Sequence, residues 1–240
     1  MKRVLRKGGT VRCHQLAFAF ALLFTVDLWA PPNVHAQGPM TYLSNVSQSS
    51  VGSRTVGSDS WLAAIIRTGT NSAGYMLDSI QLKLEDASGS PSGFTAMLYD
   101  ESVSFGGFDP GTSLGTLMGS VDPAASGIYS YTAPPNLTLS AQTHYYLVLK
   151  AETTVADGSY NWSRADSYSY NTTGGWGVSS WFLYSLNGGS SWISDLNVYP
   201  QFSLTATPIP EPGTLGLVMV GAAFVGARRC RVRPVAGNSR

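Results

Sequence analysis

Short runs in which apolar and polar residues alternate constrain the fold of this chain more than any other sequence feature. In the run 76–84, Ile80, Leu82 and Leu84 are separated by polar residues. A period of two places successive side chains on opposite faces of a β-strand, so that one face can be buried. No convincing helical period occurs between about residues 42 and 206. The central region is therefore predicted to be all-β.

Similar runs predict the other strands, and turn-forming segments separate them. The predicted strands are 76–84, 94–99, 143–150 and 202–206, with weaker candidates at 61–66, 117–121, 128–132, 159–164 and 178–184. Segments rich in Gly, Ser, Asn and Pro lie between them, at 88–93, 105–111 and 187–189. Many short strands joined by polar turns are typical of a sandwich or jelly roll. We predict one β-sandwich or jelly-roll-like domain over residues 37–207, followed by a short stiff linker.

The first 36 residues have the pattern of an export signal. A basic segment at residues 2–12 precedes an apolar run at 16–26, and Val34-His35-Ala36 fits a small-x-small cleavage site. Cleavage between Ala36 and Gln37 is expected, after export by the Sec machinery. The twin-arginine route has no support, because the nearest arginine pair, Arg3 and Arg6, is not adjacent.

The C-terminal segment, residues 208–233, combines a rigid motif, an apolar run and a basic cluster. Pro210-Glu211-Pro212 precedes the apolar run Gly213–Ala227, which we expect to be a single transmembrane helix. Its 15 residues would span only about 22 Å as a helix, against about 30 Å of hydrocarbon. Such a segment suits a temporary hold better than a permanent anchor, although an ordinary membrane anchor is the alternative. The basic cluster is Arg228, Arg229 and Arg231, and residues 234–240 form a short tail.

This arrangement resembles the PEP-CTERM sorting signal of Gram-negative bacteria. The resemblance covers about 30 residues and lies in the Pro-Glu-Pro motif, the apolar run and the terminal arginines. It implies a membrane-embedded partner, an exosortase, that cleaves near the motif. It also implies a route from transient anchoring in the inner membrane to the cell envelope, the surface or the extracellular matrix.

The basic residues of the two terminal segments mask the acidic net charge of the region between them. The whole chain carries a formal net charge of +1. Residues 37–207 contain five basic and twelve acidic residues, a net charge of about −7. This region is therefore not expected to bind nucleic acid, because little positive charge is present to neutralise phosphates. Both cysteines, Cys13 and Cys230, lie outside it, so neither disulfides nor a thiol nucleophile are expected there.

Parts of the central region also resemble the bacterial surface domain called "choice-of-anchor". The resemblance lies in residues 77–84, 94–100, 114–117, 137–149 and 184–192. Domains of this kind are followed by various anchors, PEP-CTERM among them, and have no established biochemical activity. The resemblance therefore implies a surface module and not a reaction.

Catalytic and metal-binding patterns are weak. His144 is the only histidine between residues 37 and 207 and lies in a predicted strand without a nucleophile-elbow pattern, so no catalytic residue is assigned. The adjacent acidic pairs Glu85-Asp86 and Asp100-Glu101 leave a cryptic glycoside hydrolase open as a less favoured alternative. No cofactor is expected, except that loop carboxylates could hold Ca²⁺. The residues considered for such a site are Asp100, Glu101, Asp109 and Asp122.

Aromatic residues gather in the last third of the central region. Trp162 and Trp176 flank a loop rich in Ser, Tyr, Asn and Gly, and with Tyr168 and Tyr170 they are candidates for stacking on sugar rings. The alternative is that they fill the core. Trp181 and Trp192 are expected in core or hairpin packing. The segment 185–192 resembles the Asp-box hairpin, which implies a turn with Trp192 packed beneath it.

These features predict an exported, non-enzymatic protein of the cell surface or exopolysaccharide matrix, with a structural or adhesive role. Exosortase and the Sec machinery are its expected partners. Binding of the cell's own exopolysaccharide is the alternative function, resting on the aromatic residues.

Overall fold

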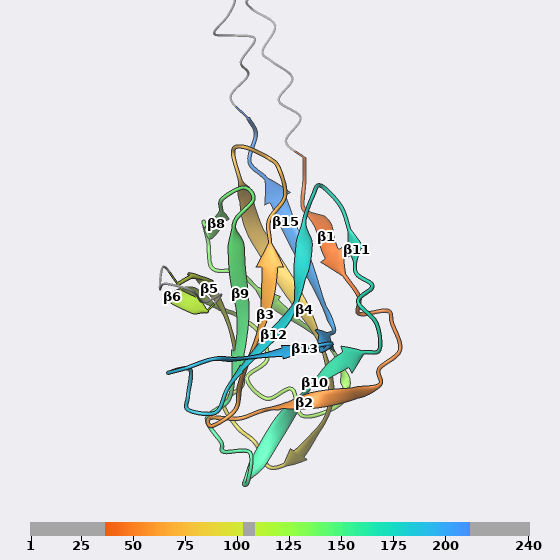
Figure 1. Ribbon diagram of the computed structural model, residues 1–240, viewed down its shortest axis with the longest axis vertical. Coiled ribbons are helices and arrows are strands. Elements are labelled where there is room, and N and C mark those ends of the chain that lie inside the picture. The colour runs from red at the N-terminus through yellow and green to blue at the C-terminus, as the bar shows by residue number, and fades with distance from the viewer. Residues whose placement is uncertain (1–36, 103–108, 212–240) are drawn as a thin grey trace, which may run out of the picture. The chain divides into compact units, whose positions relative to one another are not determined.

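The computed structural model describes residues 37–102 and 109–211, which belong to one compact unit (Figure 1). The predicted signal peptide (1–36), the apolar run (213–227), the arginine cluster and the tail all lie outside the described residues. Among the described residues, no helix has the length and apolarity needed to cross a membrane.

The described region is all-β and forms two sheets. One sheet has the strand order β11-β1-β15-β4-β10-β14, with β2 on β10 and both β7 and β8 on β4, and the other has the order β13-β12-β3-β9-β5-β6. The strands are β1 (Met40–Ser44), β2 (Gly52–Val56), β3 (Trp61–Arg67), β4 (Tyr75–Gly89), β5 (Thr95–Glu101), β6 (Pro110–Leu117), β7 (Gly127–Thr132), β8 (Thr138–Leu139), β9 (His144–Lys150), β10 (Gly158–Ala165), β11 (Asn171–Thr172), β12 (Gly177–Ser185), β13 (Ile193–Leu196), β14 (Tyr199–Pro200) and β15 (Phe202–Pro208).

Both sheets contribute to one hydrophobic core. Ile66 and Leu147 of the six-stranded sheet and Leu82 and Phe202 of the nine-stranded sheet belong to the same buried cluster, each at most 1% exposed. The alternation in β4 acts as predicted, because Ile80, Leu82 and Leu84 are buried while the residues between them are only half-buried. This two-sheet arrangement fits the predicted sandwich.

The strongest sequence patterns give the correct strands. The runs 76–84, 143–150 and 202–206 fall within or almost within β4, β9 and β15, and the weaker runs 61–66, 128–132, 159–164 and 178–184 also form strands. The prediction of a strand at 117–121 is wrong, because β6 ends at Leu117. Only a single bridge, between Met118 and Thr132, extends the pairing, and Met118 and Val121 are exposed.

The predicted hairpin at 185–192 is confirmed. The side-chain oxygen of Asn187 accepts hydrogen bonds from the Ser185 hydroxyl (2.8 Å) and the Ser191 amide (2.9 Å). Gly188 and Gly189 adopt positive φ angles of 66° and 84°, where a glycine avoids steric strain. Trp192 packs, half-buried, on a second apolar cluster on the outer face of the six-stranded sheet.

Candidate functional site

The chain between the last strand and the Pro-Glu-Pro motif is attached to the domain through hydrogen bonds. β15 pairs with β4 as far as Pro208 opposite Tyr75. Beyond the strand, the Ile209 amide donates to the Gly74 carbonyl oxygen at 3.0 Å, and Asn71 Nδ2 donates to the Ile209 carbonyl oxygen at 2.9 Å. The prediction of a linker directly after the domain is therefore corrected: the folded unit continues to Glu211.

Glu211, the acidic residue of the motif, is bound by the turn that precedes β4. Its Oε1 atom accepts hydrogen bonds from the Ser72 amide at 3.0 Å and from the Ser72 hydroxyl at 2.9 Å. Ser72 and Glu211 are both exposed, so these bonds lie at the surface. No local sequence pattern indicates this contact, because 139 positions separate its two partners. Of the predicted sorting residues, Pro210 and Glu211 are described, and Pro212 and the arginines are not.

The two candidate tryptophans are core residues. Trp162 is 1% exposed, packs edge-on against Phe182 with ring centroids 6.0 Å apart, and donates its indole N–H to the Gln201 carbonyl at 3.0 Å. Trp176 is 4% exposed and stacks on Tyr42 at 5.0 Å. Neither ring has a face open to a sugar. The structure thus corrects the prediction that these two residues bind carbohydrate, and supports their alternative role in the core.

The two candidate tyrosines lie closer to the surface. Tyr168 is 49% exposed and donates its hydroxyl to the Val178 carbonyl. Tyr170 is half-buried, packs edge-on against Tyr168 with ring centroids 5.7 Å apart, and donates to the Pro200 carbonyl at 2.8 Å. Burial raises the pKa of Tyr170 well above its usual range. The Tyr168 ring therefore remains accessible to a ligand, whereas the Tyr170 ring packs against Tyr168.

Trp181 is an exposed aromatic residue that sequence reasoning placed in the core or hairpin packing. It lies on β12 opposite Leu196 of β13 and is 46% exposed, with Leu196 at 48%. The register between β3 and β12 shifts between Val178 and Phe182. A simple alternation cannot follow the face of a residue across such an irregularity. The exposure of Trp181 excludes the core, while its pairing with β13 agrees with the hairpin alternative.

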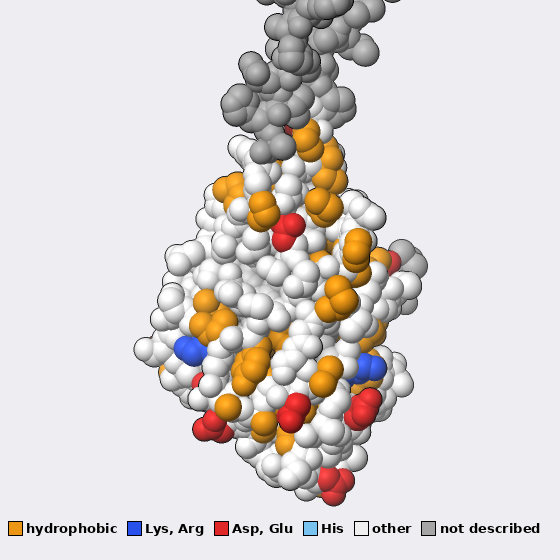
Figure 2. All heavy atoms as spheres, turned by 180° about the vertical axis from the view of Figure 1, so that it is seen from behind, with side chains coloured by type: hydrophobic (Ala, Val, Ile, Leu, Met, Phe, Trp, Pro, Cys, Tyr) orange, Lys and Arg blue, Asp and Glu red, His pale blue; other side chains and the backbone are white. Residues whose placement is uncertain are grey.

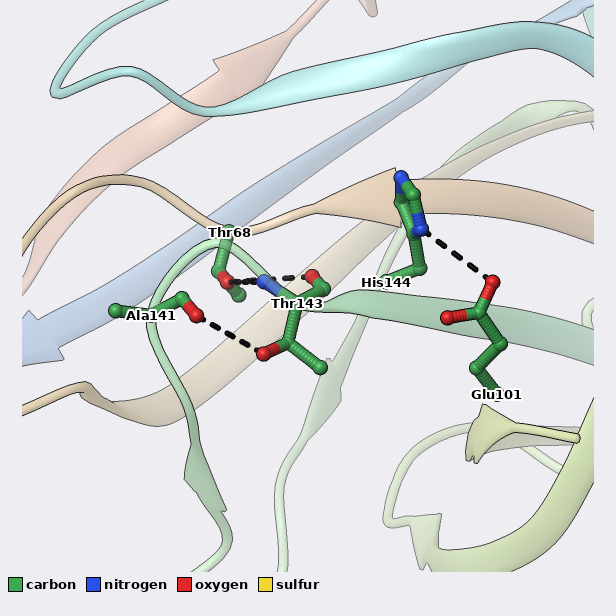
Figure 3. Close-up of polar contacts among 5 residues, drawn as sticks. All are labelled: Thr68, Glu101, Ala141, Thr143 and His144. Atoms are coloured by element: carbon green, nitrogen blue, oxygen red, sulfur yellow. Dashed lines mark hydrogen bonds and ion pairs between the residues drawn. The ribbon is translucent and has the colours of Figure 1, made fainter. Parts of the chain in front are cut away.

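His144 lies at the start of β9, as the strand-face prediction requires (Figure 3). Its Nδ1 atom lies 3.4 Å from a carboxylate oxygen of Glu101. The nearby hydroxyls of Thr68 and Thr143 are engaged elsewhere, donating to the carbonyls of Ser140 (2.6 Å) and Ala141 (2.9 Å) respectively. His144 thus lies beside the Glu101 carboxylate, and hydrogen bonds between Thr68 and Thr143 tie the start of β9 to the end of β3.

The candidate calcium ligands do not come together as one group. Asp100 accepts a hydrogen bond from the Thr112 amide, while Asp122 accepts one from the Tyr160 hydroxyl at 3.1 Å on the other sheet. Burial, together with the Asp122 carboxylate, raises the pKa of Tyr160 to about 12. Within residues 37–102 and 109–211, no group of three or more Asp, Glu, His or Cys residues is arranged to hold a metal ion. Asp100 and Glu101 lie at the end of β5, near Asp109, whereas Asp122 binds a residue of the other sheet.

The other adjacent acidic pair has structural partners. Glu85 accepts a hydrogen bond from the Ser163 hydroxyl at 2.9 Å, and Asp86 accepts one from the Ser126 amide at 2.7 Å. The partner of Glu85 lies on β10, and that of Asp86 lies just before β7. They link β4 to two different segments of the domain.

Comparison with known proteins gives one match. Residues 208–231 match the PEP-CTERM protein-sorting motif. Neither a curated protein nor a solved structure matches the chain. The motif indicates a protein that is exported, sorted by an exosortase and delivered to the cell surface while anchored in the membrane. The resemblance of the central region to choice-of-anchor domains stays a prediction.

Proposed function

We propose that this chain is a structural or adhesive component of the cell surface or its exopolysaccharide matrix, and that it acts without catalysing a reaction or holding a cofactor. One observation carries the proposal: the sorting motif begins at residue 208, where the last core strand ends. Processing at the motif would therefore display the complete β domain. A large cysteine-free core supports the idea, because such a domain does not depend on the redox state outside the cell.

The surface of the domain also supports a role in display. The exposed apolar side chains on the face in Figure 2 lie in separate groups among polar ones, and acidic side chains are spread between them. Together with the predominance of acidic residues in the sequence from 37 to 207, this surface opposes nucleic-acid binding. It suits a protein that stays hydrated when displayed outside the cell.

Mass spectrometry of the protein from its native host tests the sorting step. We expect Sec export, removal of residues 1–36 and a mature C-terminus near residues 210–212, after transient anchoring by the apolar run 213–227. An intact Arg240 in the membrane fraction would instead identify an ordinary anchor, and would remove the basis for a matrix location.

Carbohydrate binding is the second candidate function, now carried by other residues than the buried tryptophans. Tyr168 and Trp181 are exposed by 49% and 46%, and aromatic faces of this kind can stack on sugar rings. Binding of the exported protein to the host's own exopolysaccharide would be compared among the wild type, Trp181→Ala, Tyr168→Ala and a control, Val51→Ala, whose side chain is 47% exposed. A loss confined to the aromatic variants supports binding. Equal behaviour of all four proteins refutes it.

A further inference from the structure

The sorting motif is joined to the domain by its own acidic side chain. Both hydrogen-bond donors of Ser72 point at one oxygen of Glu211, at 3.0 and 2.9 Å. We propose that the turn containing Ser72 is a latch that holds the sorting motif on the folded domain, so that the exosortase acts on the motif only after this contact opens. The inference rests on the proposed sorting by an exosortase, and adds to it a residue, Ser72, that controls access to the motif.

The latch includes the backbone before Glu211. Pro208 is paired with Tyr75 at the start of β4. Ile209 is held at both its polar groups, because its amide donates to the Gly74 carbonyl and its carbonyl accepts from Asn71 Nδ2. Contacts at residues 208, 209 and 211 therefore attach one segment to the turn and to the first residue of β4. An isolated surface hydrogen bond would not fix a segment in this way, since neighbouring bonds reduce the entropy that each must overcome.

The turn itself is rigidly built and does not depend on the motif for its shape. Asn71 Nδ2 also donates to the Gly74 carbonyl at 2.7 Å, and the Asn71 amide donates to the Tyr75 hydroxyl at 3.0 Å. Gly74 has φ = 84°, and a Cβ atom added there would lie 2.5 Å from the Leu139 carbonyl oxygen. The turn is thus fixed against a neighbouring strand, and offers Glu211 preorganised donors.

When the latch is closed, the groups by which a partner would recognise the motif are already hydrogen-bonded to the domain. A protein that reads Pro-Glu-Pro can use the glutamate carboxylate and the backbone of the preceding residues, because the prolines offer no N–H donor. In the folded domain, these groups are hydrogen-bonded to residues 71–74. The apparent affinity of an enzyme for the motif then falls in proportion to the fraction of molecules in which the latch is open.

The latch can form only in the folded domain. Ser72 and Glu211 are 139 positions apart, so only a folded domain brings them together. A chain that has just been exported presents a free motif, and a folded one presents a closed motif. The contact therefore sets sorting and folding in competition, with Ser72 as a positioning residue and not a catalytic one.

Substitution of Ser72 opens the latch without altering the motif. Ser72 is exposed, so Ser72→Asp should leave the fold intact while removing the hydroxyl donor and placing a negative charge beside Glu211. Ser72→Thr keeps the hydroxyl and is the matched conservative variant. Ser49→Asp adds the same charge at another exposed serine and controls for net charge.

Hydrogen exchange on the full chain in detergent measures the latch directly. Peptides covering residues 70–76 and 205–212 report the amides of Ser72 and Ile209. We expect about tenfold faster exchange at these amides in Ser72→Asp, which corresponds to about 1.4 kcal/mol. Ser72→Thr and Ser49→Asp should match the wild type. Equal exchange in all four proteins would show that no latch forms in solution, and would overturn the inference.

Pulse-chase labelling in the native host measures the consequence for sorting. C-terminal processing of Ser72→Asp is expected to be several-fold faster than that of the wild type, with unchanged thermal stability of the mature domain. An equal or slower rate, in a host that processes the wild type, would refute the latch but leave sorting intact. If the wild type itself is never processed, the sorting proposal fails, and the exchange experiment alone decides whether the contact exists.

Discussion

The strongest prediction concerns the replacement of Trp162 by alanine. The indole is 1% exposed, lies 6.0 and 6.3 Å from the rings of Phe182 and Phe202, and donates a hydrogen bond of 3.0 Å to the Gln201 carbonyl. Removal of a buried aromatic side chain costs about 3–5 kcal/mol, through lost burial and the cavity left behind. The Gln201 carbonyl also loses its indole donor, which adds about 1 kcal/mol. We expect a total loss of about 4–6 kcal/mol.

Trp181→Ala is the matched comparison. Trp181 is 46% exposed on β12, so truncation removes less buried surface and should cost at most about 1 kcal/mol. Urea denaturation of the domain, followed by circular dichroism, measures both variants. With a slope of about 2 kcal/mol per molar urea, the midpoint of Trp162→Ala should fall by about 2–3 M, and that of Trp181→Ala by less than about 0.5 M.

The result that would refute this reasoning is specific. Equal midpoints for Trp162→Ala and the wild type would mean that the indole does not fill the core. The assignment of Trp162 to packing would then be wrong, and its candidacy for ligand binding would reopen. Trp162→Phe helps to separate the contributions, because it keeps a ring but removes the indole donor, while the Gln201 carbonyl still accepts from the Lys83 amide at 3.1 Å. Its midpoint should lie between those of the wild type and Trp162→Ala.

Two further predictions follow from the turn and from the buried tyrosines. Gly74→Ala places a Cβ atom 2.5 Å from a backbone oxygen at φ = 84° and should cost about 2 kcal/mol or more in a thermal melt, whereas Gly177→Ala, with no atom within 4 Å of the added Cβ, should be nearly neutral; equal melting temperatures would contradict the geometry of the turn. Burial and Asp122 raise the pKa of Tyr160 to about 12, from about 10 in an unfolded chain. The unfolded state therefore loses its proton first, and the stability held below pH about 10 should decline between pH about 10 and about 12. Urea midpoints at several pH values measure this decline, which Tyr160→Phe should make shallower; a pH dependence identical to the wild type would remove Tyr160 as a contributor.

Much of the fold could be predicted because the strongest strands depend on local patterns. The alternation in 76–84 predicts β4, since burial of one sheet face imposes a period of two, whereas the run 143–150 predicts β9 through consecutive aromatic, branched and aliphatic residues that are buried on both faces. Strand β6 was misplaced, because Pro110–Leu117 is largely exposed and carries little alternation. The short strands β8, β11 and β14 have two residues each, too few for a period to be recognised.

The candidate site was less predictable, because exposure is decided by contacts distant in sequence. Trp162 and Trp181 are the same residue type in similar strand patterns, yet one is 1% and the other 46% exposed. Trp162 belongs to the core cluster, whereas Trp181 lies in the register irregularity of β12, next to Phe182, which is 1% exposed on the same strand. The face on which a side chain lies, and not residue type, separates a core aromatic from an exposed one.

The sequence by itself determined the destination of this protein and the class of its fold. The sorting motif at 208–231 is a contiguous pattern that acts through its own residues, and the alternating runs carry their periodicity locally. Tertiary structure alone decided which aromatic residues are accessible, and that Glu211 is held by Ser72. Both depend on strands brought together across more than a hundred residues, and no local pattern encodes a partner at that distance.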